Sequence, residues 1–255
     1  MSTELDNRVS VVMPAFNVAP FIQMSIESVL NQSHSKLELI VVDDCSTDRT
    51  SELINRFVSI DPRVRVLNSK ENLGGAGARN LGLEVAQYRY VAFIDGDDLW
   101  HQEKLRRQID AITAQRAQIS YTAIQKVDSK GRPFGATQCV QLEVDYNALL
   151  ANPLIACSSV LLDYDAVGRP LMPDIRKRQD FAFWLKLLRE GAVARGIDDP
   201  LTYYRVRPGS LSANKLSAAV YTWRVYRSFE SLPLKKALPS FISYAWRGSM
   251  KRLNR

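Results

Sequence analysis

The first half of the chain alternates short apolar runs with longer amphipathic segments. The apolar runs are rich in Val, Ile and Leu, as strands buried in a sheet are, and they cover residues 8–13, 37–42, 64–67 and 91–94. Between them, apolar residues recur at helical spacing, which predicts helices over residues 18–31, from the loop at 43–48 to about 58, from about 74 to 82, and from about 101 to 115. Strand–helix alternation of this kind predicts an α/β fold with a mostly parallel, Rossmann-like central sheet and helices on both faces.

The second half is less regular. Residues 119–127 alternate as a strand, 128–131 form a hairpin-like turn, and 134–142 are expected to pair with that strand. The pattern further predicts a short helix over 145–150, strands over 158–162 and 200–207, and a helix over 179–188 with Phe181, Trp184, Leu185 and Leu188 on its apolar face.

Composition excludes several classes of protein. The three cysteines are far apart and form no CxxC pair, so neither a disulfide framework nor a zinc site is indicated, and a reducing compartment is expected. The first nine residues have no apolar core of signal-peptide length, and no run of apolar residues is long enough to span a membrane.

Positive charge is concentrated at the C-terminus. The formal net charge is +7, but residues 215–255 carry nine Lys or Arg and only Glu230 as an acid, so the first 214 residues sum to −1. A near-neutral body argues against a nucleic-acid cleft. Aromatic residues beside Lys and Arg predict helices that lie on an anionic membrane surface; the alternative is a helix packed on the core with a solvated basic face.

Candidate chemistry begins at the end of the fourth apolar run. Asp95, Gly96, Asp97 and Asp98 follow a strand expected to be buried, at the sheet edge where open α/β proteins bind ligands. Clustered carboxylates suit Mg2+ or Mn2+ bound together with a diphosphate, and Gly96 lets the backbone approach a ligand. The alternative is an acidic turn that caps the following helix.

Two other strand ends carry polar residues. Asp43 and Asp44 end the second strand, where an acidic side chain can accept hydrogen bonds from a base or ribose. Pro14 ends the first strand, and Asn17 is expected to cap the next helix.

A glycine-rich segment after the third strand opens a helix. Gly74 and Gly75 loosen the turn, the first N–H groups of the helix can face an anion, and Arg79 adds a fixed positive charge. Close packing of the helix on the sheet explains the glycines equally well. The segment is not a Walker A loop, because no Gly-Lys-Ser/Thr follows.

Asp180 lies in the first turn of the predicted 179–188 helix. An acid in this position often serves only the helix dipole, so the residue alone does not decide between that role and catalysis.

Taken in order, the motifs resemble those of family 2 glycosyltransferases. The resemblance is carried by Pro14-Ala15-Phe16-Asn17, Val42 to Asp48, Gly74 to Asn80, Asp95 to Asp98, Gln179-Asp180 and Tyr204-Arg205 with Ser210 to Ser212. It implies a GT-A fold and an inverting transfer from a nucleotide-diphosphate sugar, with UDP as the expected nucleotide. Residues 1–214 would form the transferase domain, divided into a nucleotide-sugar half (1–115) and an acceptor half (116–214), and 215–255 a separate tail.

The resemblance also implies roles for residues. Pro14, Ala15, Asn17, Asp43 and Asp44 would line the nucleoside pocket. Gly74, Gly75, Arg79 and Gly96 would support the nucleotide, and Asp95 and Asp97 would hold Mn2+ or Mg2+. Asp180 would be the general base, facing a hydroxyl of a glycan or lipid-linked acceptor at the inner face of the cell membrane.

One position departs from the family pattern. Many relatives carry His where this chain has Arg207, which can neutralise phosphate but cannot ligate a metal.

Two other functions share parts of the pattern. A non-catalytic nucleotide-sugar-binding protein would not need both Asp97 and Asp180, and a nucleotidyltransferase would need a glycine-rich activation loop after the first strand, which is absent.

Overall fold

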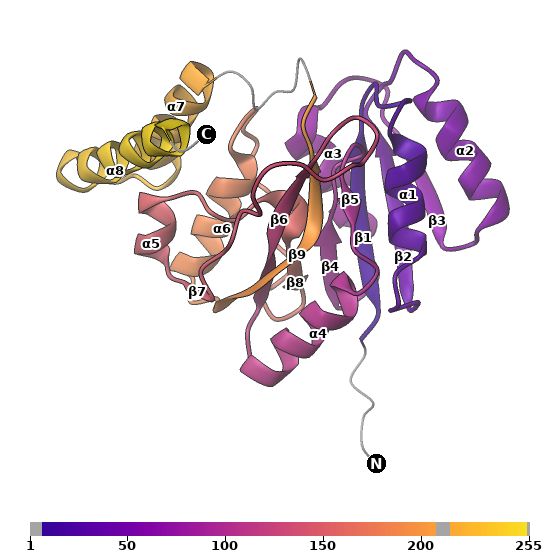
Figure 1. Ribbon diagram of the computed structural model, residues 1–255, viewed down its shortest axis with the longest axis horizontal. Helices are drawn as coiled ribbons and strands as arrows, with labels where there is room; N and C mark the ends of the chain where they lie inside the picture. Colours follow the sequence, from indigo (N-terminus) through magenta and orange to yellow (C-terminus); the bar gives the residue numbers. More distant parts are fainter. Residues whose placement is uncertain (1–6, 208–214, 254–255) are drawn as a thin grey trace.

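The computed structural model describes residues 7–207 and 215–253 and has one nine-stranded sheet flanked by helices (Figure 1). The predicted strands of the first half are confirmed and pair in parallel in the order β3-β2-β1-β4, with Val11 opposite Leu39 on one side and opposite Ala92 on the other. Pro14 does not end the first strand as predicted, because β1 continues to Ala15 and Pro14 lies opposite Val42 of the neighbouring strand. Their bounds are β1 (Val9–Ala15), β2 (Leu37–Asp43), β3 (Val64–Asn68) and β4 (Tyr90–Phe93).

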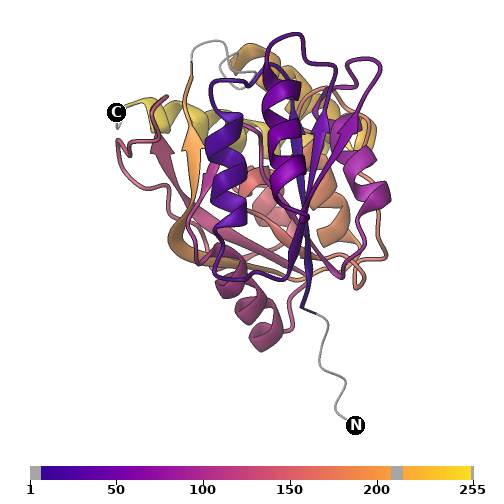
Figure 2. The same cartoon turned by 90° about the vertical axis from the view of Figure 1, so that its right-hand side faces the viewer.

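Helices cover both faces of this parallel half, as parallel pairing requires. Alternate residues of β1 face opposite layers: Val11 packs with α1, α2 and α4, whereas Val12 packs with α3. Figure 2 shows α1 and α2 side by side on the near face. The bounds are α1 (Ile22–Leu30), α2 (Thr50–Ile60), α3 (Gly74–Val85) and α4 (Lys104–Gln115).

The second half continues the sheet with mixed pairing. β8 (Leu161–Asp163) lies antiparallel between β4 and β6 (Ile119–Val127), and β9 (Ala194–Arg205) runs parallel to β6. Two short strands complete the sheet by antiparallel pairing with β9, namely β5 (Leu99–Trp100) and β7 (Glu143–Val144).

Three strand predictions in this half need correction. Residues 134–142 do not form a strand and make only an isolated bridge from Gln138 to Ile124, because Gly135 adopts a left-handed φ of 67° that breaks the extended run. The strand predicted over 158–162 begins only at Leu161, since Ser158 and Ser159 belong to a 3-10 turn. The last strand begins earlier than predicted, at Ala194, and ends at Arg205.

Beyond the sheet, α5 (Tyr146–Ala151) and α6 (Gln179–Arg189) pack on the same layer as α3. Trp184 of α6 is fully buried against Phe93 of β4, with ring centroids 5.9 Å apart. The predicted apolar face of α6 is confirmed, since Phe181, Trp184, Leu185 and Leu188 are all buried.

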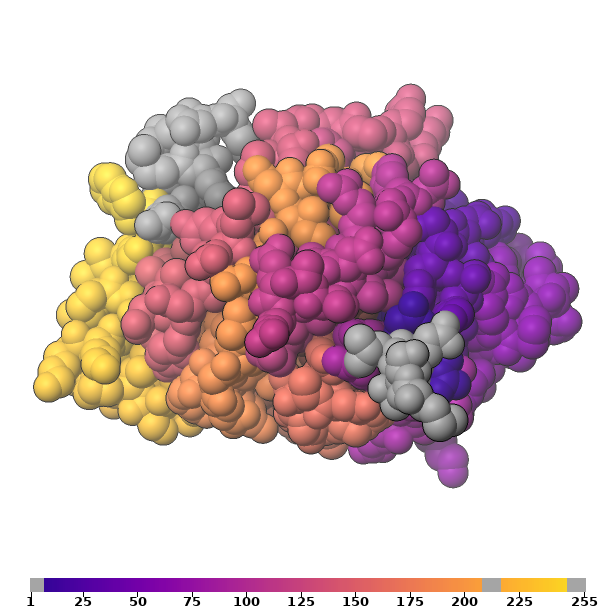
Figure 3. Space-filling model, turned by 90° about the horizontal axis from the view of Figure 1, so that it is seen from below, coloured from indigo at the N-terminus to yellow at the C-terminus, as the bar shows by residue number. Residues whose placement is uncertain are grey.

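The C-terminal residues form α7 (Lys215–Arg224), a π-helical turn (Val225–Phe229) and α8 (Leu234–Leu253). Tyr226 and Ala237 are buried in the main core, so these elements pack onto the domain. They lie at the end of the molecule remote from α2 (Figures 1 and 3). Within the described residues, no helix is long and apolar enough to cross a membrane.

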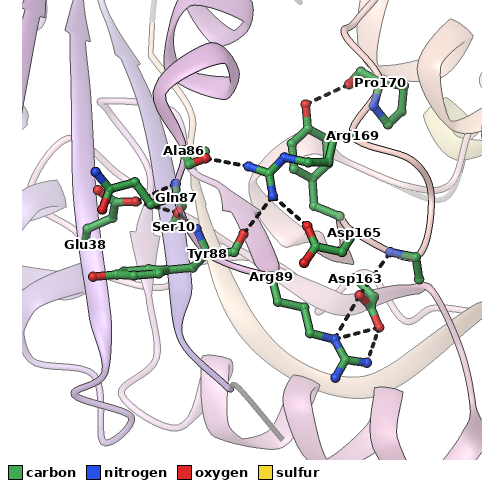
Figure 4. A network of polar contacts seen from close by, with 12 residues as sticks. Ser10, Glu38, Ala86, Gln87, Tyr88, Arg89, Asp163, Asp165, Arg169 and Pro170 are labelled. Carbon is green, nitrogen blue, oxygen red and sulfur yellow. Dashed lines mark hydrogen bonds and ion pairs between the residues drawn. The ribbon is translucent and has the colours of Figure 1, made fainter.

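Buried polar contacts fasten the loop that leads into β4, at the edge where β1 and β2 begin (Figure 4). The Ser10 hydroxyl donates to Glu38 at 2.7 Å and accepts the Tyr88 N–H at 3.1 Å. Arg89 pairs with Asp163 of β8 at 2.6 Å. These bonds fix β4 between β1 and β8, so that the opposite end of β4 is held in place.

Candidate active site

The carboxyl ends of β1, β2 and β4 meet at one edge of the sheet, the upper edge in Figure 1. The Ala15 carbonyl accepts the Asp44 N–H at 2.8 Å, and the Pro14 carbonyl accepts the Gly96 N–H at 3.2 Å. A Cβ at position 96 would lie 3.1 Å from the Pro14 oxygen, which is why glycine fits there. The structure therefore brings these predicted residues together.

Asn17 connects the loops that follow β1 and β2. Its side-chain oxygen accepts the Thr47 N–H at 2.8 Å, and its own N–H donates to the Ser46 hydroxyl at 3.1 Å. The prediction that Asn17 caps the next helix is wrong, because Asn17 has a left-handed φ of 50° and α1 begins only at Ile22.

Asp43 and Asp44 use their carboxylates to hold neighbouring loops. Asp44 accepts the N–H groups of Leu73 at 2.7 Å and Gly74 at 2.9 Å, and Asp43 accepts the Ser46 N–H at 3.1 Å. Burial raises the pKa of Asp44, and the two N–H donors oppose this effect. Asp44 thus ties the end of β2 to the start of α3.

Arg79 of α3 is buried beneath the glycine-rich loop. It is only 5% exposed, donates to the Gly75 carbonyl at 3.0 Å and pairs with Asp95. Burial acts to lower the pKa of Arg79, but Cys157, Asp95 and Asp180 together raise it above its ordinary value. The Asp180 carboxylate therefore lies in the electrostatic neighbourhood of Arg79 and Asp95, although 85 residues separate the two acids along the chain.

Asp97 and Asp98 follow Asp95 but differ in their partners. Asp97 accepts a hydrogen bond from Arg207 Nε at 2.6 Å, whereas the fully buried Asp98 accepts the Arg205 N–H at 2.9 Å. Burial raises the pKa of Asp97, and Asp95 raises it further. The pKa of Asp98 rises well above its usual range, first through burial and then through repulsion by Asp95 and Asp97.

Two residues absent from the sequence-based site hold this acidic loop. The Ser158 hydroxyl donates to Asp98 at 2.6 Å and accepts the Asp95 N–H at 3.1 Å. Arg205 donates from Nε to the Asp97 carbonyl at 2.6 Å. Arg205 belongs to the matched pair Tyr204-Arg205 but is given no role there, because nothing in the local sequence indicates that its guanidinium turns toward the acidic loop.

Asp180 is the second residue of α6. Its Oδ1 accepts the Phe181 N–H at 2.8 Å, and the side chain is partly exposed. The preceding Gln179 lies near the glycine-rich loop, since a Cβ on Gly75 would come within 3.0 Å of its amide nitrogen. The start of α6 thus faces the start of α3.

The described residues contain no cluster of three or more His, Cys, Asp or Glu side chains placed to hold a metal ion. Two carboxylates of the acidic loop, residues 95–98, each form an ion pair with an arginine: Asp95 with Arg79 and Asp97 with Arg207. Asp98 is satisfied by Ser158 and the backbone and is too buried to offer a free oxygen.

Comparison with known sequences identifies the family. The model of glycosyl transferase family 2 matches residues 10–158. TuaG of Bacillus subtilis strain 168, named for teichuronic acid biosynthesis, is 41% identical over 245 residues, covering 96% of this chain and 97% of TuaG. WfaP of Escherichia coli, named a UDP-Glc:alpha-D-GlcNAc-diphosphoundecaprenol beta-1,3-glucosyltransferase, is 36% identical over 86% of each chain.

Solved structures agree on the fold. TarS 1-349 of S. aureus in complex with UDP-GlcNAc matches with a TM-score of 0.71 and 19% identity, over 92% of this chain and 71% of that one. The mannosyltransferase PcManGT of Pyrobaculum calidifontis, in complex with GDP-Man and Mn2+, matches with a TM-score of 0.71 and 20% identity, over 92% and 68% of the two chains. The predicted GT-A fold is confirmed, and the chain belongs to glycosyl transferase family 2.

Proposed function

We propose that this glycosyltransferase moves a sugar from a UDP-sugar to a hydroxyl of a lipid-linked glycan, with inversion and with Asp180 as the general base, in bacterial polysaccharide biosynthesis. The observation that carries the proposal is that the start of α6, which carries Asp180, lies at the glycine-rich loop beside the buried Arg79: a Cβ on Gly75 would lie 2.9 Å from an Arg79 nitrogen and 3.0 Å from the Gln179 amide nitrogen, and Arg79 pairs with Asp95 at the end of β4. One carboxylate lies with the donor-binding strand ends and the other on a helix of the second half, as two sides of a transfer reaction require.

Support for the donor comes from the strand ends and from relatives. The loops after β1 and β2 are joined by hydrogen bonds and form what we call the nucleoside rim. It comprises Pro14, Ala15, Asn17, Asp43 and Asp44 and is suited to a nucleoside. WfaP is named for a UDP-glucose donor, and the TarS structure contains UDP-GlcNAc. The N–H groups of α3 that follow Gly74, whose own N–H donates to Asp44, suit the anionic diphosphate.

The residues present fit a divalent cation. Two carboxylates, Asp95 and Asp97, supply the hard oxygen ligands that Mn2+ and Mg2+ prefer, and burial, with a further contribution from Asp95, raises the pKa of Asp97. A bound ion would neutralise charge on the leaving diphosphate. Arg207 would also help to neutralise the diphosphate, since its guanidinium forms an ion pair with Asp97 in the same loop.

The reaction requires one proton to be removed from the acceptor hydroxyl as that oxygen attacks the anomeric carbon. Asp180 is partly exposed and contacts only its own helix backbone among the hydrogen bonds described, so a carboxylate oxygen is free to accept that proton.

The test is the variant Asp180→Asn, with Asp174→Asn on the preceding loop as the matched control because Asp174 is exposed. Transfer and release of UDP should fall by at least about 100-fold in Asp180→Asn while UDP binding by calorimetry persists. Asp174→Asn should behave as the wild type. Undiminished transfer by Asp180→Asn would remove the base from the proposal, and release of pyrophosphate instead of UDP would indicate a nucleotidyltransferase.

The C-terminal tail, residues 215–255, supports an acceptor held at an anionic membrane. One apolar stripe of α8, hereafter the outer stripe, consists of large side chains that recur every four residues and are each at least 53% exposed. Its members are Leu234, Leu238, Ile242 and Trp246. Basic residues flank it along the tail. An apolar stripe with a basic surround suits an anionic bilayer surface, and WfaP is named for an undecaprenol-linked acceptor.

Flotation with vesicles tests this part. The full chain should float with phosphatidylglycerol-containing vesicles and not with neutral ones, and Leu238→Glu with Ile242→Glu should abolish flotation. Ile60→Glu on α2 is the matched control, because Ile60 is 74% exposed but remote from the tail. Equal flotation of the stripe variant and the wild type would contradict the assignment.

A further inference from the structure

Arg178 occupies a position that local preferences disfavour. It is the residue before α6 and adopts a left-handed φ of 65°, which glycine or asparagine tolerates better than arginine. A cation at a helix N-terminus also has the wrong sign for the helix dipole. Since both local effects oppose arginine here, a contact from elsewhere in the structure must account for it.

That contact comes from α8. Arg178 Nη2 donates to the Tyr244 hydroxyl at 3.0 Å, and its guanidinium carbon lies 5.5 Å from the centre of the Tyr244 ring. Tyr244 also affects buried Tyr226, whose pKa is raised first by burial and then by Tyr244, with Arg178 acting in the opposite direction. The contact of Arg178 with Tyr244 is hereafter called the tail clamp.

Other contacts hold the same end of α6 against the tail. Lys177, one residue earlier, donates to the Ser217 hydroxyl of α7 at 2.8 Å. Phe181, one turn in, packs edge-on against Tyr226 with ring centroids 6.1 Å apart. Residues 177, 178 and 181 thus all contact tail residues, and Asp180 lies between them.

The clamp uses the face of α8 opposite the outer stripe. This face points toward the domain and carries Ala237, Phe241 and Tyr244. The Phe241 ring packs edge-on against Trp223 of α7, with ring centroids 5.3 Å apart. Asp180 itself makes its described hydrogen bond only to its own helix, so its direction depends on where the first turn of α6 is placed.

From these contacts we infer that Tyr244 and Arg178 are positioning residues for the transfer reaction: the tail clamp holds the start of α6 so that Asp180 faces the acceptor hydroxyl. The inference rests on the proposed role of Asp180. It makes the tail part of the catalytic apparatus as well as a surface element, because its inner face sets the first turn of the helix that carries the base.

Three variants test it in the full-length protein. Tyr244→Phe removes the hydroxyl but keeps the ring, and Arg178→Gly removes the guanidinium while its backbone accepts the left-handed φ without strain. Tyr146→Phe is the control, because it removes a tail–body hydrogen bond to Glu230, 2.7 Å long, that does not involve the start of α6. We measure kcat, the KM for UDP-sugar and thermal stability of each.

The expected result is a split between catalysis and stability. Tyr244→Phe and Arg178→Gly should each lower kcat by about tenfold, with a donor KM within about twofold of wild type, because misplacement of a reacting group slows the chemical step. Their effects on kcat should not multiply when the two are combined, since they break one contact. A purely structural role predicts instead that the relaxed Arg178→Gly backbone keeps full activity.

The outcomes separate the two hypotheses. If kcat of Tyr244→Phe and Arg178→Gly equals that of Tyr146→Phe while Asp180→Asn is inactive, the clamp has no positioning role and the proposed base stands. If Asp180→Asn itself retains transfer, the proposed base fails and this inference fails with it.

Discussion

Lys104 allows a direct test of how burial of a charged group affects the free energy of unfolding near the site. It is fully buried on α4, donates from Nζ to Gln108 Oε1 at 2.7 Å and lies 3.9 Å from the centre of the Trp100 ring. Trp100 in turn donates to the Ser158 carbonyl at 2.8 Å, so Lys104 underlies the residues that hold the acidic loop. Burial lowers the pKa of Lys104 well below its ordinary 10.5, with only Cys157 opposing it.

This shift makes stability depend on pH with a definite sign. Between the lowered folded pKa and 10.5 the unfolded chain binds a proton at Lys104 that the folded chain does not, so stability rises with pH. The slope from this one group is at most about 1.4 kcal/mol per pH unit. The Lys104→Met variant keeps the volume and lacks the proton, so it lacks this contribution.

The size of the change follows from two opposing effects. The proton that folded Lys104 lacks costs the wild type up to about 1.4 kcal/mol of stability for every pH unit below 10.5, down to its folded pKa, and the methionine variant avoids this cost. Loss of the hydrogen bond to Gln108 Oε1 costs about 1–3 kcal/mol at every pH. Lys104→Met should therefore be more stable than wild type at pH 7, and the advantage should shrink and reverse toward pH 10.

Urea denaturation of both proteins from pH 7 to pH 10 measures the difference, in which the titration of all other groups cancels. Transfer activity should stay near wild type, because Trp100 and Ser158 separate Lys104 from the carboxylates. A difference in stability that does not change with pH would refute the reasoning, since it would mean that Lys104 binds its proton equally in both states.

Three further variants probe the fold and the site. Gly82→Ala should cost about 1–3 kcal/mol in urea denaturation, because its Cβ would lie 2.5 Å from Cγ1 of Val12. Ser158→Ala should cost about 1–3 kcal/mol because buried Asp98 Oδ2 loses its hydrogen-bond donor, and kcat should fall because the acidic loop is loosened. Asp44→Asn should raise the donor KM about tenfold in steady-state kinetics, since one amide oxygen cannot replace two carboxylate oxygens in holding the start of α3.

Much of the parallel half could be predicted from the sequence. Apolar runs fixed the positions of β1 to β4, and because parallel strands end at one edge, Asp44 and Asp95 were expected to come together. The antiparallel placement of β8 between β4 and β6 could not be predicted, because strand order depends on contacts between distant segments. The partners Ser158 and Arg205 were missed for the same reason: their role depends on where the chain folds back.

The tail shows the limit of periodicity. The sequence predicts helices there and leaves two alternatives, contact with a membrane surface or packing on the core. In the structure, Phe241 and Tyr244 pack inward, whereas Ile242 and Trp246 are exposed. Both sets satisfy helical spacing, so the pattern alone cannot decide which contacts the domain. The choice is set by complementary partners on the body, such as Arg178 for Tyr244.

Three of the six described non-glycine residues with left-handed backbone lie at the candidate site. Asn17, Cys45 and Arg178 have φ of 50°, 64° and 65°, and they lie after β1, after β2 and before α6. Such conformations cost roughly 1–3 kcal/mol each and persist only where surrounding contacts determine them. Asn17 is held by the loop after β2, and Arg178 by Tyr244. Asn17 and Cys45 therefore lie on the side of the proposed nucleoside rim and Arg178 on the side of the proposed base, whereas Arg116, Arg169 and Ser231, the other described non-glycine residues with left-handed φ, lie away from the site.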